Sequence, residues 1–221
     1  MKVACFIPIK SNSERIPGKN FKMLCGKPLY QYIIDHAIAA NCFDFICVDT
    51  NSFQVQQYCD KVGVHWIERE AELASNSANG NDLLSHHFQK YPNFDFYFQL
   101  FATAPFLQPG SISKAVACLT ESIEYDSVFT VLSMQGFFWH SGVPVNYRPC
   151  ILPRSQDMCP VIEETTGLYG ISGYALAKYR SRIGSKPYFY EVSKFEAVDI
   201  NTEEDLRIAE FIGASYWKYN S

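Results

Sequence analysis

The sequence contains no run of about 18 apolar residues, the length that a membrane-spanning helix requires, so no membrane partner is expected. Its N-terminal segment, MKVACFIPIK, has too short an apolar stretch for a secretory signal and lacks a cleavage pattern. The eight cysteines form no C-x-x-C pair and no metal-ligand spacing, which indicates buried free thiols. Together these absences predict a reduced, cytoplasmic protein.

An excess of basic charge is also missing. The 19 Lys and Arg residues are outnumbered by 23 Asp and Glu residues, giving a formal net charge of -4. A protein that binds nucleic acid over much of its surface is strongly basic, so nucleic acid is not expected as a partner. Any basic site must therefore be local. The 221 residues, 48% of them hydrophobic and 19% charged, suit one globular domain over residues 1–221.

Apolar runs alternate with segments of helical period along most of the chain, as is typical of an α/β fold. The runs at residues 3–9, 43–50 and 94–101 predict buried strands. Residues 26–40 and 202–214 have the apolar spacing of helices. We therefore expect a mostly parallel sheet flanked by helices.

Residues 135–166 interrupt this alternation. The segment is rich in Pro, Gly and aromatic residues and shows neither the helical nor the strand period. It is too long for an ordinary connection inside a compact domain, so we expect an inserted arm or subdomain. Its aromatic cluster GFFWH, at residues 136–140, is expected in an interface or a core, because exposed apolar patches are commonly covered by a partner.

The loop after the first expected strand, within IPIKSNSERIPGKN at Ile7 to Asn20, combines three cations with a Pro-Gly turn. Ligands of open α/β sheets bind at the carboxyl ends of strands, so this position favours a phosphate site over the alternative, a solvated basic turn. The loop has neither the Walker pattern nor a dinucleotide glycine fingerprint. The residues expected to neutralise or hydrogen-bond phosphate are Lys10, Ser11, Asn12, Ser13, Arg15, Lys19 and Asn20.

The same segment, continued as IPIKSNSERIPGKNFKMLCGKPL, resembles the signature of the acylneuraminate cytidylyltransferases, the CMP-sialic acid synthetase family. That signature is usually I-P-A-R-x-x-S-K-R-I-P-x-K-N followed by L-x-G-K-P-L. REAELASNSANGNDLL and LFATAPFL are similar to two internal family segments, and VDINTEEDLRIAE is similar to the closing D-I-D-T-x-E-D-L-x-x-A-E. The matches occur in the family's order and span nearly the whole chain.

The resemblance implies a Rossmann-like nucleotidyltransferase fold with a small dimerisation arm, which the family's homodimers exchange across a two-fold axis. It also implies a reaction, in which a sugar hydroxyl attacks the α-phosphate of CTP and pyrophosphate leaves, with Mg2+ assisting. The product is a CMP-sugar for surface glycans. The acceptor is expected to be an acidic sugar, either a nonulosonate or a sialic-acid-like compound.

The resemblance also assigns residues to the nucleotide half of the site. Lys10 and Lys19 are expected to hold the triphosphate and, with Asp199, to be catalytic. Arg69 and the segment around Ala78 match family positions that hold the cytidine. Asp199 is expected to bind Mg2+, a hard cation that prefers carboxylate oxygens.

The chain departs from the family pattern around the metal and the acceptor. Asn201, the expected second metal ligand, stands where the family has aspartate, and the amide removes a charge. Phe101 stands where relatives have a glutamine that contacts the sugar, and an arginine expected near the acceptor is missing from EETTGLYGIS. The residues expected to bind the acceptor are Gln99, Phe101, Thr103, Arg154 and Glu164.

These departures leave alternatives open. The acceptor could be an octulosonate, a phosphonate or another acid, and the chain could be a non-catalytic descendant that binds CTP with little turnover. Glu163 and Glu164 could supply a base for the acceptor hydroxyl or form a solvated charge pair. Arg154 could form a surface salt bridge instead of a substrate contact. His86 and His87, adjacent on an expected helix, point apart and are expected on a partly exposed face.

Overall fold

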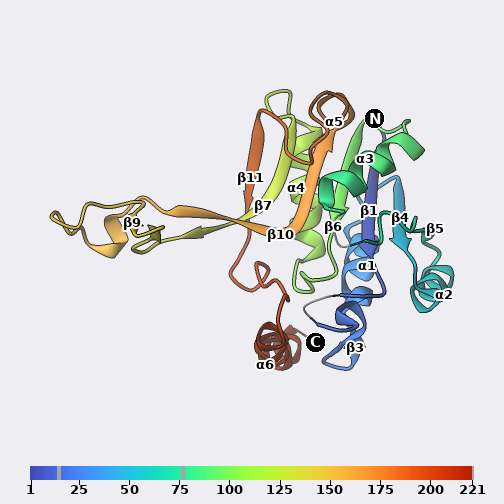
Figure 1. The fold of residues 1–221 in the computed structure, drawn as a ribbon, viewed down its shortest axis with the longest axis horizontal. Helices are drawn as coiled ribbons and strands as arrows, with labels where there is room; N and C mark the ends of the chain where they lie inside the picture. The colour runs from blue at the N-terminus through green and yellow to red at the C-terminus, as the bar shows by residue number, and fades with distance from the viewer. Residues whose placement is uncertain (14–15, 76–77, 221) are drawn as a thin grey trace.

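A seven-stranded sheet forms the centre of the molecule (Figure 1). The computed structural model describes residues 1–13, 16–75 and 78–220, with side chains through residue 215. The strand order across the sheet is β11-β7-β10-β6-β1-β4-β5. The strands are β1 (Val3–Ile9), β4 (Phe45–Thr50), β5 (His65–Glu68), β6 (Phe96–Leu100), β7 (Ser127–Met134), β10 (Val161–Ser172) and β11 (Pro187–Glu191).

The sheet is mostly parallel, as the alternation of strands and helices predicts. β1 pairs in parallel with β4 on one side, where Ala4 lies opposite Phe45, and with β6 on the other, where Cys5 lies opposite Phe98. β5 pairs in parallel with β4, and β11 with β7. β10 runs antiparallel to both of its neighbours, β6 and β7. The expected α/β sheet is therefore confirmed, with one antiparallel strand inside it.

Helices cover both faces of this sheet (Figure 1). Successive residues of a strand point to opposite faces, so β1 contributes to two cores. Cys5 and Ile7 pack with side chains of α1, α2 and α4, whereas Ala4 and Phe6 pack with side chains of α3 and α5. The helices are α1 (Leu29–Ala40), α2 (Phe53–Val62), α3 (Gly80–Lys90), α4 (Pro109–Thr120), α5 (Gly173–Tyr179) and α6 (Glu203–Asn220). The short elements are η1 (Lys19–Phe21), β2 (Met23–Leu24), β3 (Lys27–Pro28), β8 (Trp139–His140), β9 (Val143–Pro144) and η2 (Ser155–Asp157).

The inserted segment forms a long arm that projects from the sheet (Figure 1). β7 and β10 continue beyond the body as a two-stranded ribbon, in which Met134 pairs with Val161. Residues 161–166 are therefore part of a strand, and the insertion itself covers residues 135–160. Apolar side chains are exposed along it. They include Phe137, Trp139, Val143, Val145, Ile151 and Leu152.

All eight cysteines are free thiols, but the expectation that they are buried is wrong for several of them. Cys5, Cys47 and Cys59 are buried in the core. Apolar residues next to a cysteine occur in core strands, but also in a projecting arm or a turn. The sequence therefore does not show which of these cysteines are buried. The exposed cysteines are Cys25, Cys150 and Cys159.

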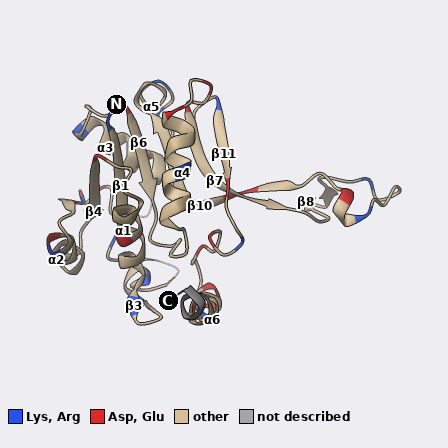
Figure 2. Ribbon diagram, turned by 180° about the vertical axis from the view of Figure 1, so that it is seen from behind, with Lys and Arg blue, Asp and Glu red and all other residues tan. Residues whose placement is uncertain are grey.

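The described part of the chain contains no membrane-spanning helix, and charged residues of both signs are intermixed along its ribbon. No helix there is long and apolar enough to cross a membrane. Figure 2 shows Lys and Arg spread along the chain among Asp and Glu. The basic residues that matter for ligand binding are therefore expected to act locally.

Candidate active site

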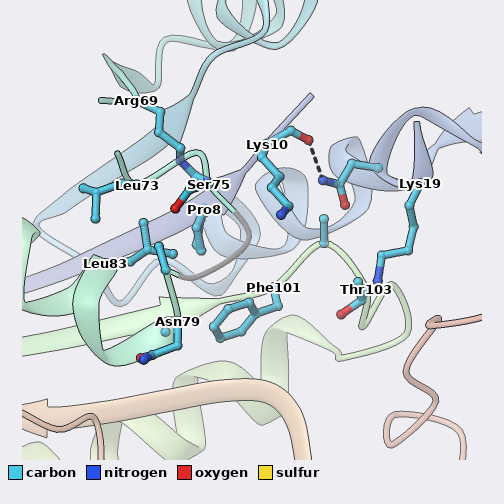
Figure 3. A pocket seen from close by; sticks show the side chains of 14 residues that line it. Pro8, Lys10, Lys19, Arg69, Leu73, Ser75, Asn79, Leu83, Phe101 and Thr103 are labelled. Atoms are coloured by element: carbon cyan, nitrogen blue, oxygen red, sulfur yellow. Dashed lines mark hydrogen bonds between the residues drawn. The ribbon is translucent and has the colours of Figure 1, made fainter. Parts of the chain in front are cut away.

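A cavity of about 240 Å³ opens at the carboxyl ends of β1 and β6 (Figure 3). Pro8 comes from β1 itself, and Lys10 and Phe101 follow β1 and β6 directly. This edge is where ligands bind in open α/β sheets. The remaining lining residues are Lys19, Asn20, Arg69, Leu73, Ser75, Ala78, Asn79, Gly80, Leu83, Ala102 and Thr103.

Asn20 fastens the loop that follows β1. Its side-chain amide donates a hydrogen bond to the carbonyl of Lys10 at 3.0 Å, the dashed line in Figure 3. Gly18 has φ of 63° and ψ of 28°, a left-handed conformation that favours glycine. The side chain of Lys10 lines the cavity. Asn20 therefore shapes the loop, and the side chain of Lys10 forms part of the cavity wall.

Lys19 connects the same loop to the segment before α6. Its Nζ donates to the carbonyl of Ile200 at 2.9 Å and to Oδ1 of Asn201 at 3.3 Å. The N–H of Ile200 donates in turn to the carbonyl of Thr103 at 2.9 Å. These bonds place the segment that carries the expected metal ligands beside the cavity.

Three other expected phosphate contacts, Ser11, Asn12 and Ser13, do not line the cavity. The backbone N–H of Ser11 donates to Oδ1 of Asn51 at 2.8 Å, which fixes the start of the loop. Arg15 lies outside the described residues. Direct contacts of these four residues with a nucleotide stay predictions.

Arg69 is a buried cation in the cavity wall, and Asp49 holds it. Its Nε donates to Oδ1 of Asp49 at 2.9 Å, and its Nη2 donates to the backbone carbonyl of Asp49 at 2.9 Å. The other carboxylate oxygen of Asp49 lies 2.8 Å from Nε2 of His87 on α3. All three side chains are buried. The orientation of the Arg69 guanidinium is therefore set before any ligand binds.

Burial and hydrogen bonding set the protonation states of this network. Burial raises the pKa of Asp49, but the hydrogen bond with His87 and the charge of Arg69 outweigh it and hold the pKa below its usual value. Burial lowers the pKa of His87, although the bond with Asp49 opposes the shift. Nδ1 of His87 is buried without a hydrogen-bond partner. The network is thus an ionised Asp49 between a charged Arg69 and a neutral His87 that donates from Nε2.

The expectation that His87 lies on a partly exposed face is wrong. Its side chain is fully buried and stacks on Phe6, with 4.4 Å between the ring centroids. His86 keeps partial exposure, as expected. His87 follows the buried Leu83 and Leu84 at helical spacing, so it belongs to the inward stripe of α3. That spacing was the signal in the sequence that could have identified it.

Asp199 offers an oxygen that suits a metal ion. Its Oδ1 is buried without a hydrogen-bond partner, while its Oδ2 accepts a short bond from Nδ2 of Asn201. The described ranges contain no group of three or more His, Cys, Asp or Glu that could hold a metal ion. Mg2+ commonly takes only one or two carboxylates and completes its shell with water and phosphate, so Asp199 fits a magnesium ion shared with a nucleotide. Asn201 directs its oxygen at Lys19 here, and its role as a ligand stays a prediction.

Residues 4–183 match the model of the cytidylyltransferase family. The chain belongs to this family. This member is 28% identical to the N-acylneuraminate cytidylyltransferase A of Danio rerio, over 94% of this chain and 50% of the relative. It is 27% identical to the N-acylneuraminate cytidylyltransferase of Streptococcus agalactiae serotype V, over 99% of this chain and 54% of that relative. It is 32% identical to the CMP-N,N'-diacetyllegionaminic acid synthase of Legionella pneumophila, over 52% of this chain and 52% of that relative. This family member thus spans about half the length of the curated relatives it matches.

Two solved structures, of a synthetase and of a synthase, have a similar fold. A CMP:2-keto-3-deoxy-manno-octonic acid synthetase complexed with CTP has a TM-score of 0.74 and 17% identity, covering 98% of this chain and all of its own. The 4-diphosphocytidyl-2C-methyl-D-erythritol synthase of Anaerococcus prevotii has a TM-score of 0.72 and 10% identity. The match covers 98% of this chain and 96% of the synthase. At these identities the likeness concerns the fold alone. It confirms the Rossmann-like nucleotidyltransferase architecture.

Two residues expected on the acceptor side lie in the cavity wall of this cytidylyltransferase family member. They are Phe101 and Thr103. Gln99 does not line the cavity, because it is fully buried and its Nε2 donates to the carbonyl of Gly80 at 3.0 Å. Gln99 therefore supports the start of α3 from below the cavity surface.

Glu164 and Arg154 lie in different surroundings. Glu164 accepts a short hydrogen bond from the hydroxyl of Tyr169, and its Oε1 lies 3.5 Å from Nη2 of Arg182. Arg154 lies on the arm, where its Nε bonds to Asp157 at 2.6 Å and its side chain is 73% exposed. This is the surface salt bridge that the sequence left as the alternative, so a substrate contact of Arg154 stays a prediction. Arg182, the partner of Glu164, belongs to no sequence motif and was not predicted at this site.

Proposed function

We propose that this chain transfers CMP from CTP to the hydroxyl of an acidic sugar, a nonulosonate or a sialic-acid-like compound, and releases pyrophosphate. The observation that carries the proposal is the convergence of Lys10, Lys19 and Arg69 on one cavity, beside the unpartnered carboxylate oxygen of Asp199. Relatives named as N-acylneuraminate cytidylyltransferases and as a CMP-N,N'-diacetyllegionaminic acid synthase support the choice of acceptor.

In this reaction the protein mainly positions the substrates and neutralises charge, and does little covalent chemistry itself. The acceptor oxygen forms a bond to the α-phosphorus, and the bond from that phosphorus to the oxygen shared with the β-phosphate breaks. That oxygen leaves with pyrophosphate, and the hydroxyl proton passes to water. Lys10 and Lys19 bring positive charge to the phosphates, and Arg69 is fixed by Asp49 to meet the base or ribose. Asp199 would hold Mg2+, which neutralises charge on the phosphate oxygens when bound.

The proposal also includes a homodimer and a cytoplasmic location. A homodimer joined through the arm would cover the exposed apolar side chains between Phe137 and Leu152. A cytoplasmic location suits eight free thiols, because disulfides are rare in a reducing compartment.

The proposal is tested by measuring pyrophosphate release from CTP and Mg2+ with a panel of sugar acids, namely N-acetylneuraminate, a legionaminate and 2-keto-3-deoxy-manno-octonate. ATP, GTP and UTP serve as nucleotide controls. We expect release that requires CTP and one class of acid. Release only with a phosphonate or another acid would change the acceptor. Clear CTP binding by calorimetry without release would support a binding-only descendant, for which Asn201 in place of the family's aspartate is the motivating observation.

A further inference from the structure

Arg182 lies on a loop whose backbone is held in place from two sides. Its own N–H donates to Oδ1 of Asn81 on α3 at 3.0 Å. Farther along the loop, the carboxylate of Asp126 accepts from the N–H of Ser185 at 2.8 Å and from the N–H of Lys186 at 2.9 Å. These bonds tie the connection between α5 and β11 to the body. The Arg182 side chain therefore starts from a fixed backbone.

The Arg182 guanidinium lies against the buried ring of Tyr169 and near Phe101, a residue of the cavity wall. Its Cζ is 3.6 Å from the centroid of the Tyr169 ring and 5.9 Å from that of Phe101. A Cβ built at Gly80 would lie 2.6 Å from Nη1, so the guanidinium also approaches the first turn of α3 closely. Phe101 and Gly80 both line the nucleotide cavity. The guanidinium thus lies next to that cavity, with one face stacked on an aromatic ring.

The charge of Arg182 is poorly balanced by the protein. Its side chain is 24% exposed, and the anion within reach is Glu164, whose Oε1 is 3.5 Å from Nη2. In the described part of the chain, the guanidinium makes no closer hydrogen bond to a side chain or carbonyl. A guanidinium has five N–H donors, so the contact of Nη2 with Glu164 leaves other donors without an acceptor among the described residues. Burial and the bond to Glu164 raise the pKa of Tyr169, which keeps its hydroxyl a donor to Glu164.

We propose that Arg182 binds the carboxylate of the acceptor and thereby restricts the acceptor to sugar acids, an inference that rests on the proposed function. Two parallel N–H bonds from a guanidinium match the geometry of a carboxylate. The family's arginine near the acceptor is missing from the segment at residues 163–172. Arg182 supplies the charge from a different segment, where it stacks on Tyr169 and lies near Phe101 of the cavity wall.

The test compares Arg182→Gln and Arg182→Lys with the wild-type protein, using a sugar acid and its methyl ester as paired acceptors. Arg180→Gln is the matched control, because Arg180 is exposed and does not line the cavity. For Arg182→Gln we expect the KM for the acid to rise about 10- to 100-fold, the range that a lost charge-assisted hydrogen bond gives. The KM for CTP should stay within about twofold, since Arg182 does not meet the phosphates in this proposal. The preference for acid over ester should disappear, and Arg182→Lys should restore part of it.

Unchanged acid-over-ester preference in a folded Arg182→Gln variant would overturn the proposal and leave Arg182 a structural residue. If the wild-type protein releases no pyrophosphate with any acceptor, the acid is titrated by calorimetry into protein that holds CTP and Mg2+. Acid binding that Arg182→Gln loses would support Arg182 as the anchor without turnover. Equal binding by both proteins, or no acid binding, would refute it. CTP binding, measured separately, reports on the nucleotide half of the proposed function.

Discussion

Nε2 of His87 lies 2.8 Å from Oδ2 of Asp49, although the two residues are 38 positions apart in the sequence. The contact joins α3 to the end of β4 beside the cavity that Arg69 lines. Through Asp49 it also reaches Arg69, whose guanidinium is held by both the side chain and the backbone of Asp49. The first two predictions follow from this buried network.

Asp49→Asn is expected to destabilise the fold, because it leaves the buried guanidinium of Arg69 without its countercharge. The free energy of unfolding should fall by about 3 kcal/mol, the lower end of the cost of breaking a buried ion pair. Urea unfolding measures the change. Asp60→Asn is the control, since Asp60 is exposed, and a loss below about 1 kcal/mol is expected there. Equal losses in the two variants would contradict a special role for the buried pair.

The network also predicts a pH dependence of stability. Burial lowers the pKa of His87 in the folded state, whereas the unfolded chain has the ordinary value near about 6.5. The unfolded state therefore takes up a proton that the native state does not, and stability falls as the pH drops below that value, by at most about 1.4 kcal/mol per pH unit. The lowered pKa of Asp49 acts in the same direction only in more acidic solution, below its unfolded value of about 4.

His87→Gln isolates this effect, because glutamine can donate to Asp49 but does not titrate in this range. The loss of stability between about pH 7.5 and about pH 5.5 should be smaller in the variant than in the wild-type protein. Urea midpoints at the two pH values give the comparison. The same loss in both proteins would show that other groups cause the pH dependence.

Lys19→Ala should reduce pyrophosphate release about 100- to 1,000-fold, the usual effect of removing one group that stabilises developing charge. The variant also loses the bonds from Nζ to Ile200 and Asn201, so its melting temperature must be measured beside its kinetics. Lys22→Ala is the control, because Lys22 pairs with Glu203 at the surface. Retained turnover in folded Lys19→Ala would refute the assigned role.

Asn201→Asp tests the metal site. A second carboxylate beside Asp199 would replace the amide that now donates to it, so the two charges would repel each other until a cation binds. We expect a lower melting temperature without Mg2+, a larger rise on adding Mg2+, and a lower Mg2+ concentration for half-maximal turnover. Identical Mg2+ titrations of the variant and the wild-type protein would show that Asn201 does not limit metal binding.

The arm offers a test of the proposed homodimer. Replacing Trp139 and Leu152 together by Asp places charges on exposed apolar positions of the arm and should shift the sedimentation of the protein from dimer to monomer. Phe53→Asp is the control, because Phe53 is an exposed apolar residue of α2. Monomeric wild-type protein would contradict the proposed assembly.

The sequence predicted features that depend on local pattern. The apolar run at Val3–Ile9 became an inner strand of the sheet, and the cationic loop after it supplied Lys10 and Lys19 to the cavity. Two features that depend on distant contacts were missed. Nothing near Asp49 indicates that His87 will bind it, and the position of Arg182 depends on bonds that tie its loop to other elements.

The arm begins and ends at residues that face each other, since Met134 and Val161 are partners in the antiparallel ladder. Neighbouring strands of this kind can be closed by a two-residue turn such as Asn-Gly. We therefore expect the arm to be removable, because a shortened chain that joins β7 to β10 directly keeps every strand of the central sheet. Such a miniature version would separate what the nucleotide cavity does by itself from what the projecting ribbon adds.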